Sequence, residues 1–133
     1  MRRWARRLGE GGAVTTEMVI VMPLVLTFVL LLAQAALYIH AAHIAQAAAS
    51  HALAAARAQG GSAAAGQDEA NRVLDLLGRG PLRSARIAVV RDSERAEIRV
   101  RGTASSVLPF LHLSVRARAV GPTEDFAPGA GPP

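Results

Sequence analysis

The sequence predicts an α+β fold in which one long N-terminal helix carries a short helix and a small three-stranded antiparallel sheet. Three observations support this prediction. Residues 18–39 contain no Asp, Glu, Lys or Arg, and a helix of ~20 apolar residues can cross a bilayer. The alanine-rich stretch that follows has no Gly or Pro before Gly60, so the helix should continue beyond the membrane. After Gly61 the apolar residues first repeat with the period of a helix and then alternate, as they do in strands.

Composition limits the possible functions. With 133 residues, the chain has room for one small domain besides the apolar segment. It has no cysteine, which excludes disulfides, lipoprotein anchors and thiolate metal sites. The formal net charge is +5, but residues 1–12 contain four Arg and one Glu, so the remainder would carry only +2 (eleven Arg against nine acidic residues). This nearly neutral body does not favour nucleic acid as a main partner.

Four segments follow from these patterns. Residues 1–12 form a basic leader, and its four arginines predict a cytoplasmic N-terminus by the positive-inside rule. Residues 13–59 form the transmembrane and extended helix, which places everything after about residue 40 outside the cytoplasmic membrane. Residues 60–120 form a small extracytoplasmic α+β domain. Residues 121–133 are rich in Gly, Pro and Ala, and we expect a disordered tail.

Two residues interrupt the start of the membrane helix. Glu17 places a carboxylate at the mouth of the apolar run, where a charge is costly unless it reaches water or a cation. Pro23 removes one backbone hydrogen bond and should kink the helix. Such a kink is tolerated in membrane helices where neighbouring groups satisfy the freed carbonyl.

A secretory signal is an alternative interpretation of the same region. Such signals have a basic start, a shorter apolar stretch and a small-x-small cleavage site, and the sequence Ala33-Gln34-Ala35 offers one. Cleavage after Ala35 would release a soluble protein. This interpretation gives Glu17 no role, and the apolar run continues past the cleavage site.

The extended helix carries small residues and histidines at helical spacing. The stripe Ala41, Ala45, Ala48, Ala52 and Ala55 could let another helix approach closely in a bundle, or it could reflect only the helix propensity of alanine. Both interpretations remain open. His40 and His43 share a face, but no neighbouring Asp, Glu or Cys completes a metal site. We therefore expect no metal and no cofactor.

The outer domain should contain a helix from residue 63 or 68 to Leu77, followed by strands within residues 86–101 and 113–119. One sheet face would carry five arginines: Arg86, Arg99, Arg101, Arg116 and Arg118. This face could dock phospholipid head groups, a polymer or DNA. We prefer a solvated face whose charge is offset by Glu94 and Glu97, because no aromatic residues interleave to stack on bases.

The outer domain also contains an apolar loop, and its sequence shows no catalytic pattern. Residues 107–111, Val-Leu-Pro-Phe-Leu, form a loop or an edge because Pro109 cannot donate in a central ladder. We expect their apolar side chains to fold onto the core rather than to face a partner. No nucleophile stands beside a base and no glycine loop could cradle a phosphate. We therefore expect a structural protein and not an enzyme.

The N-terminal pattern as a whole resembles the TadE-like family. A basic leader, Gly12, Ala13, Glu17 five residues after the glycine, Pro23 and a leucine-rich run stand in the family's order. The outer domain, with alternating strands around a Pro-containing loop, is similar to the same family. The resemblance implies a pilin-like minor pilin or pseudopilin of the Flp (Tad) tight-adherence pilus or a related secretion machine. It also implies cleavage between Gly12 and Ala13 by a membrane prepilin peptidase, which supplies the catalytic aspartates.

The resemblance also implies partners and a location. The partners would be the prepilin peptidase, other Tad pilins and pseudopilins, the inner-membrane assembly platform and the lipid bilayer. The protein would be a single-pass protein of the cytoplasmic membrane, with its C-terminal domain outside or in a cell-surface pilus. Glu17 would pair with the new amine of a neighbouring subunit, or would only mark the membrane boundary.

One departure from the family pattern bears on the subunit's role. Met18 stands where major Flp pilins have tyrosine, which together with the outer domain indicates a minor subunit. Two alternatives remain open. One is a secreted or signal-anchored protein unrelated to pili, and the other is a DNA-uptake pseudopilin, which would depend on the arginine face.

Overall fold

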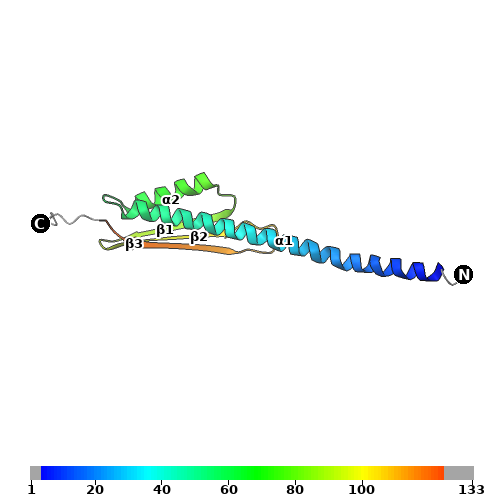
Figure 1. The fold of residues 1–133 in the computed structure, drawn as a ribbon. Coiled ribbons are helices and arrows are strands. Elements are labelled where there is room, and N and C mark those ends of the chain that lie inside the picture. Colours follow the sequence, from blue (N-terminus) through cyan, green and yellow to red (C-terminus); the bar gives the residue numbers. More distant parts are fainter. Residues whose placement is uncertain (1–3, 125–133) are drawn as a thin grey trace.

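The structure is a computed structural model that describes the backbone of residues 4–124 and the side chains of residues 14–124. It confirms the predicted α+β class (Figure 1). The five elements in chain order are α1 (Trp4–Arg57), α2 (Ala63–Leu77), β1 (Leu82–Arg91), β2 (Arg95–Ala104) and β3 (Ser114–Pro122).

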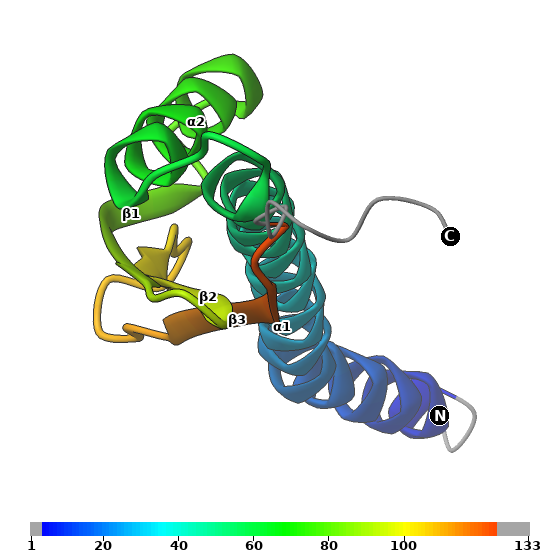
Figure 2. The ribbon, with the colours of Figure 1, turned by 90° about the vertical axis from the view of Figure 1, so that its left-hand side faces the viewer.

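Helix α1 runs without interruption for 54 residues, which corresponds to about 80 Å at 1.5 Å per residue. It continues through Pro23, and the Thr27 hydroxyl donates to the Pro23 carbonyl at 2.8 Å. Figure 2 shows α1 changing direction in its blue N-terminal part. The predicted kink at Pro23 itself stays a prediction.

The sheet has the order β1-β2-β3, and both strand pairs are antiparallel. Both helices lie on one face of it (Figure 2), with α1 over β2 and β3 and α2 beside β1. Helix α2 begins where the Ser62 side chain accepts a hydrogen bond from the Ala65 amide at 3.0 Å. It ends at Gly78, whose φ of 87° suits a residue without a Cβ.

The core lies between α1, α2 and the inner face of the sheet. Six alanines of α1 are fully buried by this chain: Ala41, Ala45, Ala48, Ala49, Ala52 and Ala56. Opposite them lie Leu74, Leu82, Ile98, Val100 and Val115. Gly66 of α2 approaches α1 so closely that an added Cβ would lie 2.9 Å from the Ala56 Cβ. Most of the small-residue stripe therefore packs within its own subunit, and only Ala55 of the predicted five is half-buried.

The loop between β2 and β3 differs from its prediction. Val107 is 45% exposed and Phe110 is 78% exposed, so the expectation that the loop folds onto the core is wrong. The inner face of the sheet is already filled by the alanines of α1, and the loop lies beyond the strand ends. Only Leu108 and Leu111 are half-buried.

Strand β3 extends to Pro122, two residues into the segment expected to be a tail. The Glu124 amide then donates to the Arg57 carbonyl at 2.7 Å, which ties the end of β3 to the end of α1. Residues 125–133 of the predicted tail, like the whole predicted leader (residues 1–12), lie outside the residues whose side chains are described.

Candidate functional site

The N-terminal half of α1 is an exposed apolar rod. Most of its large apolar side chains from Val14 to Leu32 are exposed, and α1 is long and apolar enough to cross a membrane. Residues 14–32 rise about 28 Å, close to the ~30 Å thickness of a bilayer's hydrocarbon core. This segment fits a single-pass membrane anchor.

Glu17 lies at the N-terminal end of this rod. Its side chain is exposed and lies beside Val14, Met18 and Val21. Among residues 14–124, no cationic side chain forms an ion pair with it. Ala13 and Glu17 are four residues apart in α1, so they share a helix face at an axial separation of about 6 Å. An amine created at Ala13 would thus lie one helical turn from the carboxylate.

The predicted processing site, Gly12 and Ala13, falls within the bounds of α1, and its side chains lie outside the described residues. Cleavage between these two residues stays a prediction. The same holds for the pairing role of Glu17.

Gln34 is a structural residue that sequence reasoning did not identify. Its side chain is only 3% exposed and lies two residues after the exposed Leu32. Its Oε1 accepts hydrogen bonds from the Ser106 hydroxyl at 2.8 Å and the Val107 amide at 3.1 Å. Its Nε2 donates to the Ser105 carbonyl at 3.4 Å. The available signal was a lone amide within an apolar run, which indicates a specific partner.

The contacts of Gln34 bear on the secretory-signal alternative. Cleavage after Ala35 would remove the side chain that holds residues 105–107. It would leave the Val107 amide without this acceptor, at a cost that is typically about 1–3 kcal/mol for a buried group. The fold therefore favours a chain in which residue 34 is retained.

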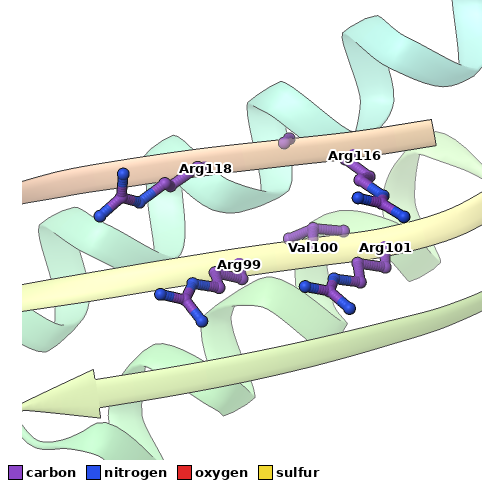
Figure 3. Close-up of a pocket in the computed structure, with 6 residues that line it drawn as sticks. Arg99, Val100, Arg101, Arg116 and Arg118 are labelled. Carbon is purple, nitrogen blue, oxygen red and sulfur yellow. The ribbon is translucent and has the colours of Figure 1, made fainter.

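The predicted arginine face is present on the outer side of the sheet. Figure 3 shows four of its members side by side on β2 and β3: Arg99, Arg101, Arg116 and Arg118. Arg86 joins them from β1, where it is paired with Arg101. Like charges placed opposite each other across strands are destabilising. A neighbouring carboxylate would reduce the repulsion among these arginines.

Glu97 supplies that carboxylate. It accepts hydrogen bonds from Nε of Arg118 at 2.9 Å and from Nε of Arg99 at 2.5 Å. These bonds, with that from Arg118 the larger cause, hold the pKa of the Glu97 carboxyl below its ordinary value. The pocket on this face is lined by arginines, Val100 and Ala117 without an aromatic side chain, so it offers no platform for stacking bases.

The histidines of α1 lie apart from any described acid cluster. His51 Nδ1 lies 3.8 Å from Glu69 Oε1, and His40 and His43 are exposed. Glu69 is held mainly by Arg72, whose hydrogen bond lowers the pKa of the Glu69 carboxyl. Within residues 14–124, no three His, Asp or Glu side chains gather as metal ligands would.

Comparison with known proteins found a family match, and it lies within α1. The family model described as TadE-like protein matches residues 12–57. The match covers nearly all of α1 after the predicted leader, and α2 and the sheet lie outside it. No match to a curated protein or to a solved structure was found. Residues 12–57 of this chain are similar to TadE-like proteins.

Proposed function

We propose that this protein is a minor pilin or pseudopilin that a prepilin peptidase cleaves between Gly12 and Ala13. The processed chain then takes part in assembling a Flp (Tad) pilus or a related secretion machine as a structural subunit without enzymatic activity. The observation that carries the proposal is the unbroken helix α1, which is exposed and apolar where the TadE-like match begins and packed against its own domain where the match ends.

The exposed half of α1 supports the proposal through its surface. A rod of large apolar side chains can be stored in a bilayer and can later pack against the helices of other subunits. The two environments are equally dry, so transfer between them leaves the apolar side chains buried. Proposed partners are therefore the lipid bilayer, other Tad pilins and the inner-membrane assembly platform.

Glu17 gives the assembly its register in this proposal. An unpaired carboxylate in a low-dielectric setting is strongly disfavoured, and a nearby ammonium offsets the cost. The amine of Ala13 lies about 6 Å below Glu17 along the same helix. A neighbouring parallel subunit displaced by about 6 Å would bring its own amine level with this carboxylate. Cleavage would thus create the cation that the carboxylate requires.

The test is a Glu17→Gln variant in cells that carry a complete Tad system. The amide keeps the size of the side chain and removes its charge. We expect cleavage and membrane insertion as in the parent chain, with at least a tenfold loss of the subunit from assembled pili. Glu94→Gln is the matched control, because it removes one carboxylate from an exposed turn outside the membrane.

The control should assemble as the parent chain does. Equal assembly of the Glu17→Gln variant would remove the pairing role. Failure of both variants would mean that assembly responds to net charge in general and not to the carboxylate in α1.

A further inference from the structure

The loop between β2 and β3 exposes an apolar tip that no side chain of residues 14–124 covers. Phe110 is 78% exposed, more than any other large apolar side chain described, and Val107 is 45% exposed. Residues 105–113 contain no Asp, Glu, Lys or Arg. The half-buried Leu108 and Leu111 lie in the turn closed by the Leu111 amide, which donates to the Leu108 carbonyl at 3.0 Å.

The level of this loop along α1 is set by Gln34. The Val107 amide and the Ser106 hydroxyl both donate to the Gln34 side chain, at 3.1 and 2.8 Å. Figure 1 shows the β2–β3 loop as the part of the sheet that reaches furthest toward the blue N-terminal end of α1. The loop is therefore held on the side of the domain that faces the membrane anchor.

The length of the membrane anchor places the outer domain directly at the membrane surface. Exposed large apolar side chains of α1 run from Val14 to Leu32, and Tyr38 and Ile39 are exposed beyond Gln34. The first stretch alone rises about 28 Å, against a hydrocarbon core of ~30 Å. Gln34 lies only two residues further along, so it reaches the outer boundary of the hydrocarbon. A loop bonded to Gln34 reaches the same boundary.

We propose that the apolar tip at Val107 and Phe110 rests in the outer leaflet of the lipid bilayer, as a second membrane contact beside α1. An uncharged loop with an exposed aromatic residue suits the boundary between acyl chains and head groups. The axis of α1 and a second membrane contact beside it define a plane. The loop would therefore fix the rotation of the sheet about α1. The proposal needs α1 as a membrane anchor and is independent of any role in a pilus.

A fluorescence measurement can test the proposed contact. Trp4 is the only tryptophan of the chain, so a Trp4→Phe background makes Phe110→Trp a single reporter. The full chain would be reconstituted in phosphatidylcholine vesicles with and without brominated acyl chains. We expect blue-shifted emission from position 110 and at least a twofold loss of intensity in the brominated vesicles.

Val90→Trp is the matched control, because Val90 is also an exposed apolar residue, at 63%. It pairs with Glu97 near the β1–β2 turn, at the opposite end of the sheet from the loop. Its emission should stay that of a water-exposed indole, without bromine quenching. Val107→Trp provides a second reporter on the loop, so the test does not depend on a single variant.

Each outcome decides the proposal. Quenching at positions 110 and 107 that persists when the protein is diluted tenfold in lipid supports a bilayer contact of the single subunit. Water-exposed, unquenched emission from both positions overturns it. A blue shift that appears only at high protein density, without bromine quenching, also overturns it and indicates contact with a second copy of the chain.

Discussion

The two halves of α1 form one continuous helix but have opposite surfaces. From Val14 to Leu32 the apolar side chains are large and mostly exposed, whereas from Ala41 to Ala56 the inward-facing residues are mostly alanines buried to 0% exposure. In a globular core, the larger apolar residue usually has the greater tendency to be buried. This helix reverses that order, because its own sheet and α2 approach only the C-terminal half.

This difference indicates that the C-terminal half of α1 packs within its own subunit, whereas the N-terminal half is available to contact lipid or other subunits. Small side chains in the C-terminal half allow α2 and the sheet to approach closely, as the contact between Gly66 and Ala56 shows. Large side chains in the N-terminal half are mostly exposed among the described residues and suit lipid or the helices of other subunits. Gln34 lies at the junction, where it joins the helix to the domain by hydrogen bonds.

The largest expected effect on the free energy of unfolding comes from placing a large side chain in the alanine-lined C-terminal half of α1. Ala48→Leu should overpack the interface between α1 and the rest of the domain, because Ala48 has no exposed surface. Overpacking typically costs 1–3 kcal/mol, so we expect the domain's free energy of unfolding to fall by about that amount. Urea titration in detergent, followed by circular dichroism of the sheet, would measure the change.

Leu26→Ala is the matched substitution in the other half, because Leu26 is 61% exposed. It should leave the domain's stability within about 0.5 kcal/mol of the parent value, as surface substitutions usually do. Equal losses from Ala48→Leu and Leu26→Ala would mean that the two halves do not differ as described.

A second prediction concerns the junction. Gln34→Leu keeps a similar volume but removes the acceptor of the Val107 amide and the Ser106 hydroxyl. The Ser106 hydroxyl would keep the Leu108 carbonyl as an acceptor at 2.6 Å, but the Val107 amide would lose its acceptor. This amide is only partly buried, so the cost should be below the ~1–3 kcal/mol of a fully buried group, and the loop should open more often. Amide hydrogen exchange at residues 105–111 should accelerate severalfold while exchange in the centre of β2 changes little.

Gln46→Leu is the control for this substitution, since Gln46 is exposed on the same helix and donates a hydrogen bond to the Ser50 hydroxyl at 3.4 Å. It should leave loop exchange unchanged. Unchanged loop exchange in the Gln34→Leu variant as well would show that Gln34 does not hold the loop.

The smallest expected effect lies on the arginine face and depends on pH. Hydrogen bonds from Arg118 and Arg99 lower the pKa of the Glu97 carboxyl below its ordinary value of 4.5. A depressed pKa in the folded state stabilises the fold above the unfolded value and loses that contribution as pH falls through the folded value. Glu97→Gln should therefore lower the urea midpoint at pH 7, and the difference from the parent should shrink below pH 4.5.

Glu94→Gln, in the neighbouring β-turn, is the control and should show no such convergence. If the gap between Glu97→Gln and the parent chain were the same at pH 7 and pH 3, the two arginines would not be stabilising the ionised carboxylate.

The pattern of apolar residues was sufficient to predict the elements of this fold. The absence of charge in residues 18–39 predicted the membrane helix, and the alternation around Ile98 and Val100 predicted β2 and its buried face. The five arginines share the outer face because strand periodicity alone determines their side. These features are local, so they can be read from a single sequence.

The features that escaped prediction depend on contacts between distant residues. Gln34 and Val107 are separated by 73 positions, and nothing near either one indicates the other. The apolar residues around Phe110 favoured burial by composition, but the core beneath the sheet was already filled by the alanines of α1. Among residues 14–124 no cationic side chain pairs with Glu17, and its pairing with the amine of a neighbouring subunit remains a proposal.

The most direct test of the proposed role is the N-terminal sequence of the protein isolated from membranes of cells that contain a prepilin peptidase. We predict that the mature chain begins at Ala13, which would place a free amine one helical turn from Glu17 at the start of the exposed rod. A chain that begins at Ala36 would contradict this proposal, because cleavage there removes both the rod and Gln34. A chain that keeps its leader would contradict prepilin processing and leave α1 as a plain membrane anchor.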